Sequence, residues 1–247
     1  LATNSVAAWL GDGTGQFGPA ATFSTGVGPF AVAIGDLDGD GSADLAVANH
    51  TSSSVSVLRG NGDGTFRNGI EYTTGTSPHS VLMGDLDRDG DRDLVVTNDG
   101  ANTASVLLGN GDGTFGTKND FRTGSGPFSA ALGDLNGDGD PDVAVANFTS
   151  SSLSILLGDG DGNLELRRAH ATGATPRSVA TADLNGDGRA DLVTANETAN
   201  TVSVLLANAW GGFGERADLP TGVSPFTVAV GDLNSDGRAD LAVTNYT

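Results

Sequence analysis

Short apolar runs alternate with polar, glycine-rich segments along the whole chain. Runs such as Val32-Ala33-Ile34 and Leu45-Ala46-Val47 are rich in β-branched residues, which is typical of short strands. Helix formers are scarce in runs, while 38 glycines and many Ser, Thr and Asn residues suit tight turns. The pattern therefore predicts an all-β protein.

The apolar and polar segments recur with a period of 49 residues. An acidic segment begins at Asp36, and its copies begin at Asp85, Asp134, Asp183 and Asp232. A fixed period of this length is typical of architectures built from stacked copies of one supersecondary unit. Each unit is predicted to hold a Thr-Gly-x-x-Pro junction, an inner strand, the acidic loop, a second strand, a short polar turn, a third strand, a Gly-rich hairpin and a fourth strand.

The acidic segment has the layout of a calcium-binding loop. Calcium takes six to eight oxygen ligands at roughly 2.3–2.6 Å, so a short peptide must fold back on itself with acidic side chains at alternate positions. In the first loop, positions one, three, five and nine hold Asp36, Asp38, Asp40 and Asp44, and Ser42 at position seven offers a carbonyl or hydroxyl oxygen. The predicted metal ligands at positions one, three, five, seven and nine of the other loops are Asp85, Asp87, Asp89, Asp91 and Asp93; Asp134, Asn136, Asp138, Asp140 and Asp142; Asp183, Asn185, Asp187, Arg189 and Asp191; and Asp232, Asn234, Asp236, Arg238 and Asp240.

Two other interpretations of the loop are less favoured. An EF-hand is excluded because it needs a Glu at position twelve and a helix on each side, whereas position twelve is Val47 in the first loop and Val or Thr in the others. Solvated Asp/Gly turns would explain a single cluster, but five copies of the same ligand layout favour calcium. Loops one and two carry Asp at position three, where the others carry Asn, so we expect these two loops to hold calcium more tightly.

The sequence around the loop carries a family resemblance. The loop runs into Ala43-Asp44-Leu45-Ala46-Val47-Ala48-Asn49, and the turn Gly60-Asn61-Gly62-Asp63-Gly64-Thr65-Phe66 follows. This combination resembles the FG-GAP/VCBS repeat of integrin α-subunit propellers and of many secreted bacterial proteins, and it covers the whole chain. The resemblance implies a β-propeller with calcium in the loop between the first two strands of each blade. We therefore expect about five Ca²⁺ ions, one for each acidic loop.

The repeat register also predicts the domain organisation. Four blades fall at about residues 25–74, 75–123, 124–172 and 173–221. Residues 1–24 align with the last two strands of a blade and residues 222–247 with the first two, so joining them would complete a fifth blade and hide both open sheet edges. We expect residues 1–247 to form a single domain, a closed five-bladed β-propeller of 49-residue four-stranded blades. A five-repeat excerpt of a longer propeller is the alternative.

The formal net charge of −19 fits the same interpretation. The five loops hold 19 of the 31 acidic residues, so most of the acid is assigned to metal rather than to a basic partner, and five Ca²⁺ ions would bring the charge to about −9. We expect no nucleic-acid partner. Because no apolar run approaches the ~20 residues of a membrane-spanning helix, we also expect no membrane insertion.

The chain has no cysteine, so disulfide chemistry does not constrain its compartment. Millimolar calcium outside cells would keep such loops filled, which favours an extracellular or cell-surface location. No signal peptide is present in the sequence, although one could have been removed. We expect a monomer.

One face of the predicted blades varies most from repeat to repeat. In up-and-down blades the Thr-Gly-x-x-Pro junctions share a face with the Asn-x-Thr turns, opposite the acidic loops and Gly-rich hairpins. Mixed aromatic and polar residues on this face suit a sugar or peptide ligand, although exposed loop residues also vary without any role in binding. The candidate ligand-binding residues are Phe30, His79, Phe128, Arg177, Phe226, His50, Phe148 and Tyr246.

The Asn-x-Thr turns also read as glycosylation acceptors. They contain Asn49, Asn147, Asn196 and Asn245. Because all four fall at one position of the repeat, we favour a structural role for them.

Catalysis finds little support in the sequence. The three histidines His50, His79 and His170 stand in different repeats, and neither a cysteine nor a G-x-S-x-G motif is present. We therefore predict a non-enzymatic, calcium-stabilised binding module for a glycan or an extracellular protein. A calcium-dependent polysaccharide lyase that uses Arg177 with His79, and a structural or engineered scaffold without a ligand, are the alternatives.

Overall fold

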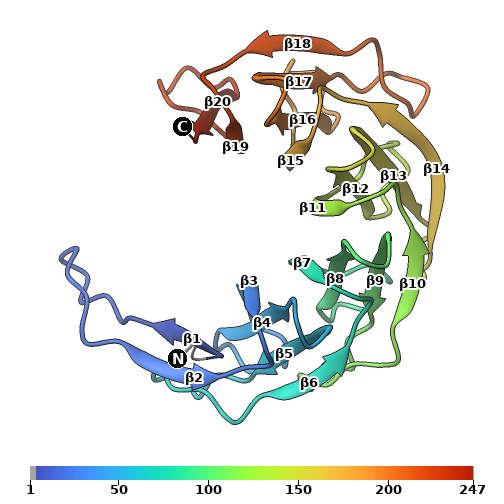
Figure 1. Cartoon of the computed structure of the whole chain (residues 1–247). Helices are drawn as coiled ribbons and strands as arrows, with labels where there is room; N and C mark the ends of the chain where they lie inside the picture. Colours follow the sequence, from blue (N-terminus) through green and yellow to red (C-terminus); the bar gives the residue numbers. More distant parts are fainter. Residues whose placement is uncertain (1–3, 247) are drawn as a thin grey trace. The chain divides into compact units, whose positions relative to one another are not determined.

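The computed structural model describes residues 4–246, which form strands joined by turns and contain no helix (Figure 1). Each complete repeat contributes four antiparallel strands in sequence order. No helix long and apolar enough to cross a membrane occurs in residues 4–246. The predicted all-β class is confirmed.

Strands at the same place in successive repeats have matching bounds. The first strands are β3 (Pro29–Gly35), β7 (Pro78–Gly84), β11 (Pro127–Gly133), β15 (Pro176–Ala182) and β19 (Pro225–Gly231). The second strands are β4 (Asp44–Asn49), β8 (Asp93–Asn98), β12 (Asp142–Asn147), β16 (Asp191–Asn196) and β20 (Asp240–Asn245). The third strands are β1 (Ser5–Ala8), β5 (Ser54–Leu58), β9 (Thr103–Leu107), β13 (Ser152–Gly158) and β17 (Thr201–Leu205). The fourth strands are β2 (Ala21–Ser24), β6 (Ile70–Thr73), β10 (Asn119–Arg122), β14 (Leu164–Ala171) and β18 (Ala217–Pro220).

The strands assemble into sheets repeat by repeat. Four sheets have four strands each, in the orders β3-β4-β5-β6, β7-β8-β9-β10, β11-β12-β13-β14 and β15-β16-β17-β18. Two further sheets have two strands each, β1 with β2 and β19 with β20. This repeat architecture agrees with a five-bladed β-propeller. The joining of β1–β2 with β19–β20 into one shared blade stays a prediction.

Residue contacts divide the chain into two compact units. Within the described residues, unit 1 consists of residues 4–101 and 105–120, and unit 2 consists of residues 102–104 and 121–246. In unit 1 the first strands β3 and β7 contact each other, and in unit 2 β15 contacts both β11 and β19. Successive sheets within a unit therefore stack through their first strands, as blades of a propeller do. The single domain expected over residues 1–247 stays a prediction.

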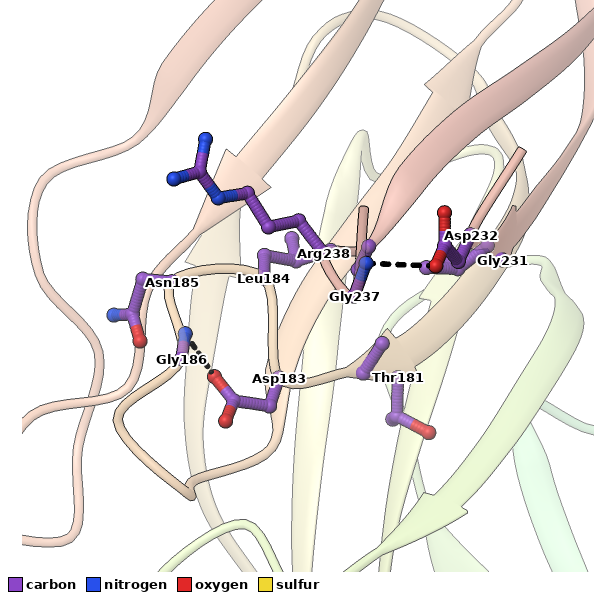
Figure 2. Close-up of a pocket in the computed structure, with 12 residues that line it drawn as sticks. Thr181, Asp183, Leu184, Asn185, Gly186, Gly231, Asp232, Gly237 and Arg238 are labelled. Carbon is purple, nitrogen blue, oxygen red and sulfur yellow. Dashed lines mark hydrogen bonds between the residues drawn. The ribbon is translucent and has the colours of Figure 1, made fainter. Parts of the chain in front are cut away.

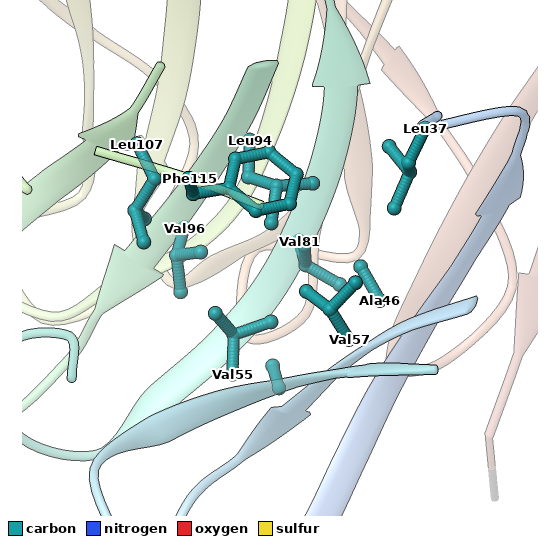
Figure 3. Packing of buried hydrophobic residues seen from close by; sticks show 10 residues of the cluster. Leu37, Ala46, Val55, Val57, Val81, Leu94, Val96, Leu107 and Phe115 are labelled. Carbon is teal, nitrogen blue, oxygen red and sulfur yellow. The ribbon is translucent and has the colours of Figure 1, made fainter. Parts of the chain in front are cut away.

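The core of each unit lies between neighbouring sheets. In unit 1, side chains of β4 and β5 pack against side chains of β7, β8 and β9, and Figure 3 shows Val57, Val81, Leu94 and Phe115 turned toward one another. Two comparable clusters fill unit 2. Every residue of β4, β8, β12 and β16 is buried. The second strands therefore carry the centre of the core, which places the acidic loop before them on a rigid support.

The loops lie on the faces that the sequence predicts. In the first complete repeat, the Gly60 N–H donates to Asp44 Oδ1 (2.7 Å), so the Gly-rich hairpin sits beside the acidic loop. The His50 N–H donates to the Gly28 carbonyl (2.8 Å), so the polar turn sits beside the Thr-Gly-x-x-Pro junction. The hairpin itself is closed by a bridge between Gly60 and Phe66.

The Thr-Gly-x-x-Pro junction is held by a buried asparagine of the second strand. Asn49 Nδ2 donates to Ser56 Oγ (2.8 Å), and the same oxygen accepts the Gly26 N–H (2.9 Å). A Cβ at Gly26 would stand 2.6 Å from Asn49 Nδ2, which is too close for any other residue. The same pairing of a glycine with an asparagine recurs at Gly75 with Asn98, Gly124 with Asn147 and Gly173 with Asn196.

This burial bears on the Asn-x-Thr triplets. Asn49, Asn147 and Asn196 are each 0% exposed, so their amides are out of reach of a modifying enzyme in the folded chain. The structural role that we favour for these asparagines agrees with their position.

We predict that Asn49→Ala lowers the free energy of unfolding by about 1–3 kcal/mol, because it leaves buried polar groups without their partner. Urea unfolding followed by circular dichroism measures the change. Asn68→Ala, at an exposed site, is the matched control and should stay within about 0.5 kcal/mol of the unmodified chain. Equal effects of the two substitutions would contradict the role given to Asn49.

Candidate functional site

Loops one and two gather carboxylates in a way that suits a cation. Oxygens of Asp36, Asp38 and Asp40 all lie within 4.8 Å of one another, and those of Asp85, Asp87 and Asp89 do the same. Like charges held this close repel one another unless a cation or protons compensate them. Hard oxygen ligands of this kind suit Ca²⁺ or Mg²⁺.

Backbone hydrogen bonds shape the first loop. The two oxygens of Asp36 accept the N–H groups of Gly39 (2.8 Å) and Gly41 (2.9 Å), and Asp40 Oδ1 accepts the Ser42 N–H (2.7 Å). Gly41 has φ of +84°, a conformation that a side chain disfavours. The alternation of short acidic residues with glycine therefore folds the loop back on itself and brings the carboxylates together.

The second loop holds a buried oxygen that fits a metal ligand. Asp85 Oδ1 is buried and has no hydrogen-bond partner among the described residues, while Asp85 Oδ2 accepts the Gly90 N–H (3.2 Å). Burial, with the neighbouring Asp89 and Asp85 carboxylates, raises the pKa of Asp87. A buried oxygen without a partner is costly, and a bound cation would remove that cost.

Loops three, four and five are arranged differently at position three. The asparagine amide there donates to the position-five carboxylate, from Asn136 to Asp138 (2.7 Å), from Asn185 to Asp187 (3.2 Å) and from Asn234 to Asp236 (3.2 Å). An amide hydrogen bond thus replaces one carboxylate charge. The difference supports the predicted ranking, in which loops one and two bind calcium more tightly, but the affinities themselves stay a prediction.

Loops four and five line a cavity of about 650 Å³. Figure 2 shows Asp183 and Asp232 in it, each held by a glycine N–H, from Gly186 (2.7 Å) and Gly237 (2.8 Å). Backbone N–H groups that donate to these carboxylates lower the pKa of both aspartates. The largest effect comes from the Gly188 N–H at Asp183 and from the Gly237 N–H at Asp232. Both position-one aspartates are therefore ionised at neutral pH, as a cation site requires.

Position seven is occupied by different side chains. Arg189 Nη1 pairs with Asp187 Oδ2 at 3.1 Å, so the position-five carboxylate of loop four already forms an ion pair with a guanidinium group. The predicted ligand role of Ser42, Asp91, Asp140, Arg189 and Arg238 stays a prediction.

The position-nine aspartates face protein N–H groups and are not members of the three-carboxylate clusters of loops one and two. Asp44 Oδ2 accepts the Leu37 N–H (2.8 Å) and Asp44 Oδ1 the Gly60 N–H. Asp93, Asp142 and Asp191 bridge the start of the loop to the start of the hairpin in the same way. Burial raises the pKa of Asp93 and of Asp142 to about 6. These carboxylates brace the loop, and their predicted role as metal ligands stays a prediction.

The candidate ligand-binding residues gather within each unit, on what we call the proline-junction surface. In unit 1 the rings of Phe30, His50 and His79 contact one another, with centroids 4.7 Å apart for Phe30 and His79 and 5.0 Å apart for the two histidines. All three rings come from the residues beside a junction proline or after a second strand. The sequence correctly places them on one face.

In unit 2 the corresponding residues surround one arginine. The Arg177 guanidinium lies 5.1, 4.8 and 4.9 Å from the ring centroids of Phe128, Phe148 and Phe226. Arg177 Nε also donates to Glu197 Oε2 at 2.6 Å. Cation–π contacts and the ion pair hold the guanidinium in place. Tyr246, at 76% exposed, has no ring contact within the described residues.

Reasoning from the sequence missed a second group of residues. Trp210, Arg168 and His170 line a cavity beside loop three, on the face of the acidic loops rather than the proline junctions. The signal was present, because Trp210 stands in the hairpin where three other repeats have Asp63, Asp112 and Asp161.

Comparisons with known proteins identify the family. The model of the FG-GAP-like repeat matches residues 2–47, 36–96, 85–145, 134–194 and 183–243. The chain therefore belongs to the FG-GAP-like repeat family, which agrees with the resemblance of its loops. No curated protein matches the sequence significantly.

Solved structures share the fold at low sequence identity. A lectin of Agrocybe aegerita, studied for its recognition of non-reducing terminal N-acetylglucosamine, has a TM-score of 0.66 and 22% identity over 97% of this chain and 68% of its own. Virginiamycin B lyase of Staphylococcus aureus has a TM-score of 0.62 and 15% identity over 92% of this chain and 67% of its own. BBS1N, in complex with ARL6DN, has a TM-score of 0.62 and 14% identity over 88% of this chain and 64% of its own. The chain spans about two thirds of the length of these proteins.

We predict that Asp87→Asn weakens calcium binding at loop two about tenfold, ~1.4 kcal/mol, because it gives this loop the position-three asparagine of loops three to five and removes one carboxylate charge. Isothermal titration calorimetry should show two tight ions in the unmodified chain and one in the variant. Asp63→Asn is the matched control, since Asp63 is exposed in a hairpin and bonds only Thr65. An unchanged isotherm for Asp87→Asn would contradict the assignment.

Proposed function

We propose that this protein is a calcium-binding extracellular module that binds a glycan through its proline-junction surface and performs no catalysis. Calcium has a structural role in this proposal, because each ion would join the ends of the first two strands of one sheet. The convergent carboxylates of loops one and two and the buried Asp85 oxygen support the choice of a hard cation. An extracellular location follows from the calcium concentration that such exposed loops need.

The glycan proposal depends on the group around Arg177. The three phenylalanine rings that surround it offer faces for the C–H groups of a sugar. Glu197 neutralises Arg177, so the group has no net charge to attract an anion. Within the described residues, the Arg177 Nη atoms and Glu197 Oε1 have no hydrogen-bond partner, so they remain as donors and an acceptor for hydroxyl groups.

Two comparisons bear on the class of ligand. The Agrocybe aegerita lectin shares the fold and recognises a sugar, which supports a glycan. BBS1N shares the fold and forms a complex with a protein, so a protein ligand is the second outcome for the test to distinguish. A lyase has less support, because Arg177 is already paired with Glu197.

We predict that the labelled chain binds a defined set of structures on a glycan array in calcium buffer, and that Phe226→Leu weakens this binding about two- to tenfold. The reason is that loss of one aromatic face from a sugar contact costs about 0.5–1.5 kcal/mol. Phe226 is 42% exposed, so the substitution should leave folding intact.

Phe17→Leu, at an exposed hairpin position of unit 1, is the matched control and should bind like the unmodified chain. The glycan proposal would be contradicted if no glycan on the array bound the chain while an extracellular protein did, and if added sugars did not inhibit that protein binding. Equal losses in both variants would contradict the assignment to the proline-junction surface.

A further inference from the structure

Unit 2 has a cavity of about 660 Å³ on the face of its acidic loops. Loop three contributes Asn136 and Asp138 to its lining, and the hairpin contributes residues 208–213. The residues of β13 and β14 that line it are called its floor. Cavities of about 300–1,000 Å³ with a few polar groups are typical of small-molecule sites.

The same place in the repeat is filled in unit 1. There Arg59 Nη1 donates to the Asp112 carbonyl (2.8 Å), and the Gly113 N–H donates to the Leu37 carbonyl (3.1 Å), so the hairpin is fastened to loop one. Two repeats later, Leu157 stands in place of Arg59 and Trp210 in place of Asp112. Leucine cannot make this hydrogen bond, and the space that Arg59 fills in unit 1 belongs to the cavity in unit 2.

Trp210 is presented to solvent by a fixed turn. Its side chain is 93% exposed, and Asn208 Oδ1 accepts the N–H groups of Trp210 (2.9 Å) and Gly212 (3.3 Å) to hold the turn. A fully exposed indole contributes nothing to the core. Such rings are frequent where a protein binds a ligand that has one apolar face.

The floor of the cavity is more polar than its counterpart in unit 1. His170 replaces Tyr72 and keeps the edge-to-face contact with the hairpin phenylalanine, 5.5 Å from Phe213. Arg168 replaces Ile70, and its guanidinium has no hydrogen bond or ion pair to the described residues. The cavity thus gains donors where unit 1 has an apolar side chain and a phenol.

The charges around the cavity nearly cancel. Arg168 is a cation and Asp138 an acid, while burial, with the nearby Arg168, lowers the pKa of His170. The histidine is therefore neutral at pH 7. A site with one flat aromatic face, mixed donors and acceptors and little net charge matches an uncharged polyhydroxylated ring better than an anion.

We propose that this cavity is a second binding site, specific for a neutral pyranose sugar that stacks on Trp210 and hydrogen-bonds to Arg168 and His170. The site lies on the face of the acidic loops, goes beyond the proposed function at the proline-junction surface, and depends on different residues. Leucine also stands at the position of Leu157 in three other repeats, so Trp210, which supplies the stacking face, is the residue that sets this repeat apart.

Tryptophan fluorescence tests the site directly in the full chain. The chain has two tryptophans, so Trp9→Phe leaves Trp210 as the reporter. Methyl β-galactoside, methyl α-mannoside and N-acetylglucosamine are the neutral probes, glucuronate is the anionic probe, and mannitol is the acyclic control that has the hydroxyls without a ring face. We expect a saturable blue shift with at least one neutral pyranose, with Kd of about millimolar, and none with mannitol.

Variants then separate this site from the proline-junction surface. Saturation-transfer NMR with the responding sugar should show at least a tenfold loss in Leu157→Arg/Trp210→Asp, which restores the side chains of unit 1, and in Trp210→Leu, whose exposed position leaves folding unaffected. Phe226→Leu should keep this binding. The proposal is overturned if no neutral pyranose gives a saturable shift, if mannitol or glucuronate alone gives it, or if the double variant binds normally.

Discussion

Repulsion between carboxylates held within 4.8 Å of one another is the constraint on which this structure depends. The backbone can brace such a loop but cannot neutralise it, because amide N–H groups carry only partial charges. In loops one to four, Asp44 and its equivalents fasten the loop to the start of the neighbouring hairpin, and the buried second strands support this contact. The fold therefore fixes the position of the acidic oxygens, and a bound cation could relieve their repulsion.

Much of this arrangement could be predicted from the sequence of the repeat. The 49-residue period identifies the strands, the acidic loops and the hairpins, and the proline and glycine of each junction mark where the first strand begins. The sequence indicates that Asn49 has a structural role but does not explain that role. Only the structure shows that its amide occupies the space of a Cβ at Gly26. Residue type predicted position nine as a ligand, whereas side-chain direction shows both Asp44 oxygens on backbone N–H groups.

The candidate binding surfaces were less predictable for a physical reason. Comparison of the repeats identifies the residues that the copies share. It does not identify residues that occur in one copy only. It placed Phe128, Phe148 and Arg177 on one face, but could not show that a guanidinium stands among three rings. It missed the cavity at Trp210, which brings together Trp210 and His170, two departures from the repeat that meet only in the fold. Residues common to the repeats thus shape the loops, whereas residues that occur in single repeats form the candidate binding sites.

The most direct test of the central claim is the thermal unfolding of the chain with and without calcium. If bound calcium relieves the repulsion in the loops, saturating calcium should stabilise the fold by about 2.7 kcal/mol for each site filled to a hundred times its Kd, and the Tm should rise by several degrees. Excess EGTA should lower it again. A Tm that stays the same in calcium and in EGTA would contradict the account.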